Sequence, residues 1–184
     1  MKSLPILRTA AFGLTLVLAG ATAHAQTTPA TMPAPAKSAA KPSPAATATG
    51  KIGASCVTVN YSSPGVKGRK IFGGLEAYGK VWRAGANEAT TVEFSKAVTV
   101  EGKALPAGKY GFFVIPAESG KWTVIFNKVS NQWGAYEYSD KQDALRVLVT
   151  PRKTAAPTER LAYEVTPKGL VLRWDTVELP VAIK

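Results

Sequence analysis

From Cys56 onward, apolar and polar residues alternate along short stretches of the chain, and this period of two is the feature that most constrains the fold. Successive side chains of a strand point to opposite faces of a sheet, so the alternation over Val57, Val59 and Tyr61 predicts a half-buried strand. The runs 110–115 and 122–126 are apolar on both faces, which predicts two central strands covered on both sides. Further strands are predicted over 90–94, 145–149, 161–165, 170–174 and 177–179.

Turn residues separate these stretches, as in Pro106-Ala107-Gly108 and Pro167-Lys168-Gly169. Short strands without helical patterns between them predict an all-β fold, an antiparallel β-sandwich of about eight or nine strands. The segments 69–86 and 128–142 do not read as strands and are predicted to be two long irregular loops. Pro180 cannot donate to a central ladder, so the last strand is expected to lie at an edge or to end there.

The first 50 residues have a different character. Residues 1–25 read as a secretory signal peptide, with Lys2 and Arg8 before an apolar run and a small-residue cleavage site at Ala23-His24-Ala25. Residues 26–50 are rich in Ala, Pro and Thr and lack aromatic residues, so they are predicted to form a disordered tether. A single β-sandwich domain is then expected over 51–184, in an exported protein that is periplasmic or secreted and has no transmembrane anchor.

Removal of the signal peptide excludes several chemistries. It takes away His24, the only histidine, and leaves Cys56 as the only cysteine. The mature chain can therefore form neither a histidine-based triad nor an internal disulfide. Its carboxylates show no metal-ligand spacing, so no metal and no cofactor are expected.

The chain is strongly basic. Its formal net charge of +11 becomes +9 without the signal peptide and +7 on 51–184. Such a surplus favours anionic partners in the cell envelope, although a basic surface can also serve solubility alone. Nucleic acid is not expected as a partner of an exported protein.

The segment 67–83 contains five cations and one carboxylate, interleaved with aromatic residues. Arg69, Lys70, Trp82 and Arg83 could bind an anionic or sugar-containing ligand, because guanidinium groups match carboxylates and phosphates while aromatic rings stack on sugars. The alternative interpretation is structural: Phe72, Leu75 and Trp82 would cap one end of the sandwich, with the cations facing solvent.

The stretch Trp82 to Glu88 carries the sharpest constellation. Glu88 is a weak catalytic candidate as general acid or base, with Arg83 holding an anionic group and Asn87 orienting a carbonyl. The structural alternative is an Arg83–Glu88 ion pair with Asn87 as a turn residue, and this alternative is favoured.

The second predicted loop is rich in amides and aromatic rings. Asn127, Gln132, Trp133 and Tyr136 provide the mix that carbohydrate-binding surfaces use, and loops on a rigid sandwich often carry function. The same residues would also suit a well-tied surface loop with Trp133 in the core.

Four blocks of sequence carry a resemblance to a known family. They are 61–75, 78–90, Leu105 to Tyr110 and Trp122 to Asn127, and the parts 67–72 and 82–88 are the most specific. Together they closely resemble the uncharacterised family of exported bacterial proteins known as domain of unknown function 2911, from about Ile52 to Ile183. The resemblance implies a secreted, mostly β domain and implies no activity.

Three functional hypotheses follow. The first is a non-enzymatic module that binds an anionic or glycan component of the envelope, and it is preferred over enzymatic activity. The second is a metal-independent hydrolase or lyase that uses Glu88 with Arg83. The third is a structural or protein-docking module, and the oligomeric state is not predicted.

Overall fold

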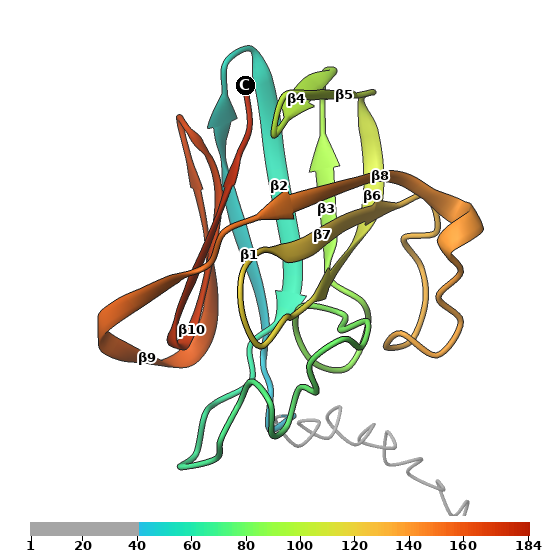
Figure 1. Ribbon diagram of the computed structural model, residues 1–184. Helices are drawn as coiled ribbons and strands as arrows, with labels where there is room; N and C mark the ends of the chain where they lie inside the picture. Colours follow the sequence, from blue (N-terminus) through green and yellow to red (C-terminus); the bar gives the residue numbers. More distant parts are fainter. Residues whose placement is uncertain (1–40) are drawn as a thin grey trace, which may run out of the picture. The chain divides into compact units, whose positions relative to one another are not determined.

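The computed structural model describes residues 41–184. The predicted signal peptide and residues 26–40 of the predicted tether lie outside the described part. The described residues contain ten β-strands, one short 3₁₀ turn and no α-helix (Figure 1). The strands are β1 (Ala45–Ile52), β2 (Ser55–Ser62), β3 (Thr91–Phe94), β4 (Val98–Val100), β5 (Lys103–Leu105), β6 (Gly108–Ile115), β7 (Trp122–Asn127), β8 (Asp143–Val149), β9 (Arg152–Thr166) and β10 (Gly169–Ala182), and the 3₁₀ turn η1 spans Asp140–Gln142. The predicted all-β fold is confirmed.

The first layer is a six-stranded antiparallel sheet in the order β1-β2-β3-β6-β7-β8. Strands β6 and β7 lie inside this order, as their two-sided apolar pattern predicted. One face of the sheet packs on the main core. Phe113 and Ile125 point to the other face, where a small second cluster includes Ala89 and the half-buried side chains of Ala135 and Tyr138.

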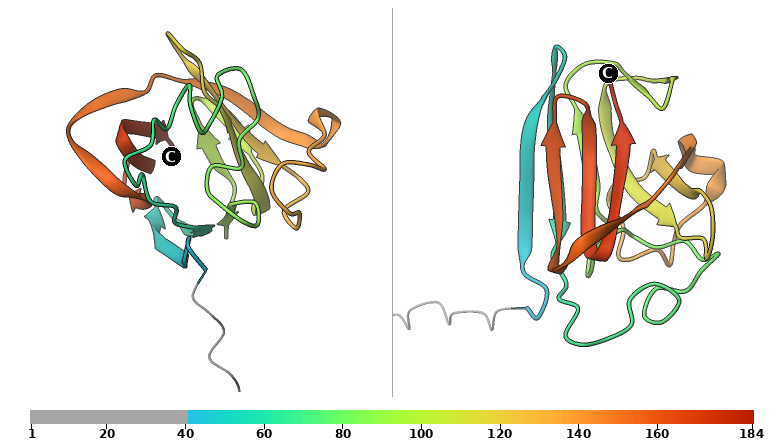
Figure 2. Two further views of the ribbon diagram at one scale, coloured as in Figure 1. Left: turned by 90° about the horizontal axis from the view of Figure 1, so that it is seen from below. Right: turned by 60° about the vertical axis from the view of Figure 1, so that its left-hand side comes forward.

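The second layer is the β9–β10 hairpin, which packs over the main core with Leu161, Leu172 and Trp174. Strand β10 changes register on both sides of Asp175, which has a φ of 52°. Its two halves then run side by side, and the Ile183 amide donates a hydrogen bond to the Lys168 carbonyl at 3.1 Å (Figure 2, right). The predicted break between strands 170–174 and 177–179 therefore coincides with a bend inside one continuous strand.

The predicted start of the folded domain at residue 51 is wrong. Residues 45–50 belong to β1, which pairs with β2 from Ala45↔Ser62 to Ile52↔Ser55 and lies beside β9. Small residues such as Ala and Thr fit a strand when a neighbouring strand supplies the hydrogen bonds, and local composition does not show that neighbour.

The two predicted irregular segments are confirmed. No named strand lies between Ser62 and Thr91, and the chain from Lys128 to Ser139 is a loop that ends in η1. Both segments contribute to the second cluster over β6 and β7, so they cover a face of the sheet that the hairpin does not reach.

Candidate functional site

The two long loops meet on the outer face of the six-stranded sheet. Glu88 and Trp133 form an isolated antiparallel bridge. The Ala89 amide donates to the Gln132 carbonyl at 3.1 Å, and the Gly134 amide donates to the Asn87 carbonyl at 3.1 Å. Segments more than 40 residues apart in the sequence thus form one connected surface.

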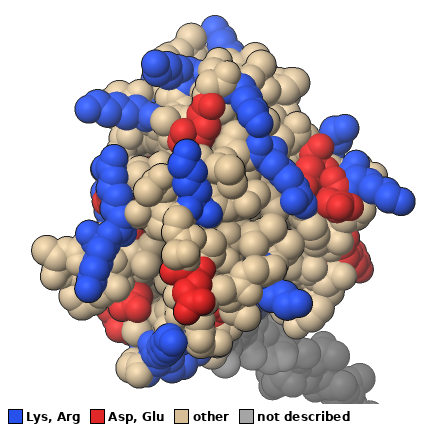
Figure 3. Space-filling model, viewed as in Figure 1, with Lys and Arg blue, Asp and Glu red and all other residues tan. Residues whose placement is uncertain are grey.

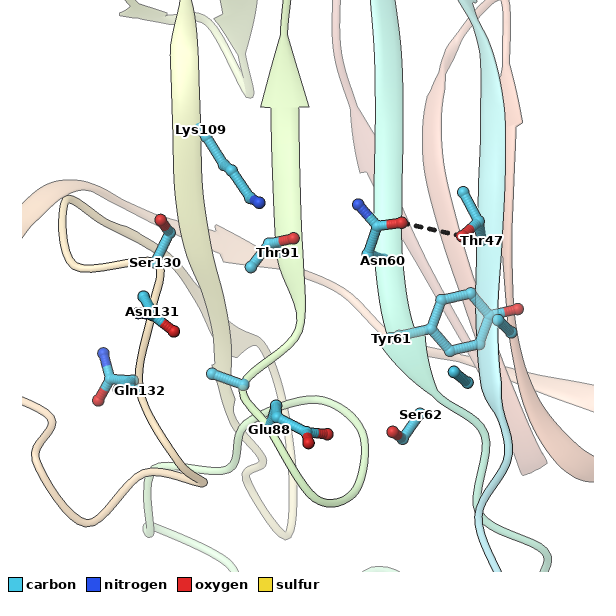
Figure 4. A pocket seen from close by; sticks show the side chains of 13 residues that line it. Thr47, Asn60, Tyr61, Ser62, Glu88, Thr91, Lys109, Ser130, Asn131 and Gln132 are labelled. Atoms are coloured by element: carbon cyan, nitrogen blue, oxygen red, sulfur yellow. Dashed lines mark hydrogen bonds between the residues drawn. The ribbon is translucent and has the colours of Figure 1, made fainter. Parts of the chain in front are cut away.

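Beside this junction lies a cleft of about 400 Å³, here called the polar cleft. Its floor is formed by side chains of neighbouring strands: Thr47 of β1, Asn60 of β2 and Thr91 of β3 are aligned in register, and Lys109 extends from β6 toward Thr91 (Figure 4). The segment Ser130 to Gln132 forms one wall, and Glu88 lies at one end.

Eight of the thirteen residues that line the polar cleft carry a side-chain hydroxyl or amide group. Thr47 Oγ1 donates to Asn60 Oδ1 at 2.8 Å, so the amide of Asn60 is oriented by its neighbour. The Asn60 amide nitrogen points away from Thr47 and across the cleft (Figure 4). This arrangement offers hydrogen-bond donors and acceptors on a rigid sheet.

The loop that forms the wall of the polar cleft carries two exposed aromatic rings. Trp133 is 56% exposed and Tyr136 is 86% exposed. The Lys41 ammonium lies 5.8 Å from the centre of the Trp133 ring and 3.1 Å from Glu88 Oε1. The prediction that Trp133 is available to a ligand therefore fits the structure better than its burial in the core.

Glu88 does not have the partners predicted for it. Its side chain forms an ion pair with Lys41 and not with Arg83, so the predicted structural pair Arg83–Glu88 is wrong. Hydrogen bonding from its own backbone, followed by the contact with Lys41, holds the pKa of Glu88 below its ordinary value. A carboxylate with a lowered pKa is poorly suited to act as a general acid at neutral pH.

Asn87 is the turn residue that the structural interpretation predicted. Its backbone is left-handed, with a φ of 57°, a conformation that Asn tolerates better than most residues. Its amide donates to the Ser43 carbonyl at 3.2 Å and to Ser62 Oγ at 3.1 Å. Asn87 thereby ties the segment before β1 to the end of β2.

The predicted cationic residues lie away from the polar cleft. Arg69, Lys70 and Arg83 are not among its lining residues. Arg69 is bound to its own loop, donating to the carbonyls of Gly65 and Val66 at 2.6 and 3.0 Å. These three cations are therefore not part of the polar cleft.

Arg69 and Arg83 act electrostatically on Glu76 instead. Burial raises the pKa of Glu76 to about 7, against the opposing influence of Arg83 and then Arg69. Arg83 Nε is buried and has no hydrogen-bond partner among residues 41–184. The carboxyl of Glu76 thus belongs to a loop cluster that sequence analysis did not identify.

Two predicted ligand-binding residues are structural. Trp82 is 3% exposed, stacks on Trp174 with ring centres 5.6 Å apart and contacts Phe72 edge-on, so it closes the core as the alternative interpretation proposed. Leu75, the third residue of that predicted cap, is 46% exposed. A Trp ring can either bind a ligand or fill a core, and only its packing in the structure shows which of these roles Trp82 has.

Asn127 is the second correction. It is fully buried, donates to the Ser139 carbonyl and to Asp143 Oδ1, and accepts from the Val129 amide. It therefore holds the start of the second loop and cannot reach a ligand. Gln132 is also mostly buried, with Nε2 bonded to the Val129 carbonyl, but it does line the polar cleft.

The floor of the polar cleft was missed by the sequence analysis. Its residues occupy outward positions of alternating strands, where a polar residue is also the ordinary solvent-facing choice. The signal that could have found them is cross-strand alignment, which the sequence of a single strand does not contain. These floor residues are Thr47, Asn60, Thr91 and Lys109, and the wall residues Ser130 and Asn131 were missed as well.

Charge is dispersed on the face of the molecule seen in Figure 3, where carboxylates lie between the lysines and arginines. Among residues 41–184 there is no group of three or more Asp, Glu, His or Cys side chains placed to hold a metal ion. The same part of the chain contains no helix with the length and apolar character needed to cross a membrane.

Comparisons with known proteins place the chain in a family without assigning an activity. Searches of curated proteins and of solved structures return no match. The family model described as "Protein of unknown function (DUF2911)" matches residues 43–183, a span that begins just before β1 and includes both loops. The chain therefore belongs to the DUF2911 family.

Proposed function

We propose that this protein binds a neutral or weakly charged glycan in the polar cleft. The observation that carries the proposal is the aligned set of Thr47, Asn60 and Thr91. The exposed Trp133, which pairs with Glu88 at one end of the cleft, adds an aromatic surface next to it. Sugar hydroxyls both donate and accept hydrogen bonds, so they match a mixture of hydroxyl and amide side chains. The C–H face of a sugar ring can pack on an indole, whose large apolar surface is otherwise in water.

The size and charge of the polar cleft support the same ligand class. Its volume of about 400 Å³ falls within the range of about 300–1,000 Å³ that is typical of small-molecule sites. Lys109 and Glu88 are the charged residues of its lining, and their charges offset one another. We infer that an anionic ligand is less well matched here than an uncharged one, in contrast to the expectation from net charge alone.

The proposed setting is the cell envelope, because the N-terminal sequence has the pattern of a secretory signal peptide. An exported chain meets surface and cell-wall glycans, which are rich in hydroxyl and amide groups. Binding without turnover is the proposed activity, since the Glu88 carboxylate has neither the raised pKa nor the partner that a general acid needs.

Trp133 provides a direct test. The other three tryptophans, Trp82, Trp122 and Trp174, are at most 4% exposed, so acrylamide quenching of the fluorescence reports mainly on Trp133. The acrylamide quenching constant of the full mature chain is measured alone and with each member of a panel of neutral and acidic envelope oligosaccharides. A bound neutral glycan is expected to lower the quenching constant at least about twofold.

Matched variants locate the binding. Asn60→Ala removes the amide that faces the polar cleft and is expected to weaken glycan binding about tenfold, the cost of roughly one well-placed hydrogen bond. Thr49→Ala, at an exposed position of β1 outside the cleft lining, is expected to leave binding unchanged. The proposal is wrong if no glycan protects Trp133, or if Asn60→Ala binds as well as the unaltered protein.

A further inference from the structure

A second cleft, of about 440 Å³, lies between the loop after β2, the β6–β7 turn and the bend of the β9–β10 hairpin. It shares no lining residue with the polar cleft. Its residues differ in kind as well, because Phe72, Tyr78 and Trp122 contribute aromatic rings and Val177 adds an aliphatic surface. We call it the aromatic cleft.

The aromatic wall is held in place by the surrounding structure. The Phe72 and Trp122 rings lie 4.7 Å apart, and Trp122 Nε1 donates to the Ala117 carbonyl at 2.8 Å. The Tyr78 ring lies against Gly73, where a Cβ would be only 2.5 Å from Tyr78 Cε2, so this position accepts the ring because it has no side chain. Rings that are fixed before binding lose little conformational entropy when a ligand packs on them.

Cations lie beside these rings. Lys153 and Arg152 line the aromatic cleft from the first residues of β9. Lys153 is exposed and forms no ion pair with any residue of the described chain, while Arg152 makes one long contact of 3.8 Å with Glu178. Glu118, on the exposed β6–β7 turn, is the one carboxylate of the lining, so the cleft is net positive.

We propose that the aromatic cleft binds a small aromatic acid. The planar ring would pack beside Phe72, Tyr78 and Trp122, where burial of apolar surface and aromatic contacts favour it. The carboxylate, phosphate or sulfonate of the ligand would lie at Lys153 and Arg152, whose ammonium and guanidinium groups are largely free to bind an anion. Tyr61 is the one aromatic residue that lines the polar cleft, and hydroxyl or amide residues make up most of the rest, so the two sites would select different ligands on one molecule.

The test compares three ligands that share one ring system: 2-naphthoate, 2-naphthyl phosphate and the neutral 2-naphthylmethanol. Their affinities for the full mature chain are measured by isothermal titration calorimetry. Both anions are expected to bind at least tenfold more tightly than the alcohol. The ratio of carboxylate to phosphate affinity then shows which head group the two cations prefer.

Variants separate the charge from the ring surface. Lys153→Gln is expected to weaken binding of 2-naphthoate about fivefold and to leave 2-naphthylmethanol unchanged, whereas Lys51→Gln, an exposed lysine on β1, changes neither. Tyr78→Ala is expected to weaken all three ligands, and Tyr136→Ala, an exposed tyrosine of the other loop, none of them. Equal affinity for anion and alcohol, failure of all three to bind, or an unchanged affinity in Lys153→Gln would each overturn the proposal.

This result is independent of glycan binding. If no oligosaccharide protects Trp133, the glycan proposal fails, but the affinity for 2-naphthoate still tests the aromatic cleft. A competition experiment completes the design: saturating 2-naphthoate is expected to leave glycan protection of Trp133 unchanged, because the two linings have no residue in common.

Discussion

The raised pKa of Glu76 results from the position of its carboxyl group in the loop after β2. Glu76 follows the buried residues Ile71 and Phe72, and its backbone amide donates to the Ile71 carbonyl at 2.9 Å. This tight turn brings the carboxyl into a partly buried position near Arg83 and Arg69, where burial outweighs both guanidinium groups and raises the pKa to about 7. The folded protein therefore holds this proton to a higher pH than an unfolded chain does.

The first prediction concerns the pH dependence of stability. Because the folded pKa is raised from 4.5 to about 7, the stabilisation from protonated Glu76 is complete below pH 4.5 and is lost as the pH rises through 7. The neutral Gln side chain of Glu76→Gln does not titrate, so this variant does not lose stability for that reason. Between pH 5 and pH 8 the unfolding free energy of the unaltered protein should therefore fall by about 1 kcal/mol relative to that of the variant. This magnitude is discounted for solvent screening at a partly exposed group. Urea unfolding at each pH measures it, with Glu137→Gln as the exposed control, and a constant difference would contradict the raised pKa.

At the scale of elements, the outer face of β6 and β7 is the surface on which the loops are assembled. The loop after β7 crosses β6 at Gly111, where a Cβ would lie 2.6 Å from the Val129 carbonyl oxygen and 2.9 Å from the Phe113 ring. Asn127 pairs with Gly111 across the ladder and binds the Val129 amide, so strand and loop are fixed at one point. The position of the 130–132 wall of the polar cleft follows from this crossing.

The second prediction tests that crossing. Gly111→Ala places a methyl group against backbone that cannot move independently, so we expect a loss of about 1–3 kcal/mol in the free energy of unfolding. The acrylamide quenching of Trp133 should change as well, because its loop is displaced. Lys109→Ala, at an outward position of the same strand, serves as control and should alter stability by less than about 0.5 kcal/mol. A fully stable Gly111→Ala chain with unchanged quenching would show that the loop does not depend on this contact.

At the scale of the whole described chain, β1 completes the sandwich. It extends the six-stranded sheet beyond β2 and lies beside β9, so it connects the first layer to the hairpin. The segment before it adds Ser43 as a partner of Asn87, and the Pro44 carbonyl as an acceptor for the Ser63 amide at 2.8 Å. Residues that resemble a linker in composition are therefore part of the folded unit and of the polar cleft.

The third prediction follows from this role of β1. A chain that begins at Lys51 loses residues 45–50, exposes the edge of β2 and removes Thr47 from the polar cleft. We expect its melting temperature to fall by more than about 10 °C relative to a chain that begins at Lys41, or the shorter chain to aggregate. Circular dichroism and size-exclusion chromatography decide between these outcomes. Equal melting temperatures would restore residue 51 as the start of the domain.

The sequence predicted the strands well and the candidate site only in part. Alternation located β2, β3 and β8, and two-sided apolar runs located β6 and β7, because both patterns are local consequences of burial. Among the predicted site residues, Glu88 and Gln132 do line one cleft, and Trp133 pairs with Glu88 at one end of it. Trp82 and Asn127 were assigned to a ligand because an aromatic ring or an amide has the same chemistry in a core as in a site.

By itself, the sequence determined that this protein is built of antiparallel strands with two long loops. Successive side chains of a strand point to opposite faces of the sheet, so burial of one face leaves an alternating pattern that can be read locally. The tertiary structure alone decided that residues 45–50 form a strand, that Arg69, Lys70 and Arg83 do not line the polar cleft, and that Thr47, Asn60 and Thr91 share its floor. Those outcomes depend on the register between strands and on the docking of loops distant in sequence. Both are set by the pairing of backbone hydrogen bonds and by the filling of a common core, which no local pattern records.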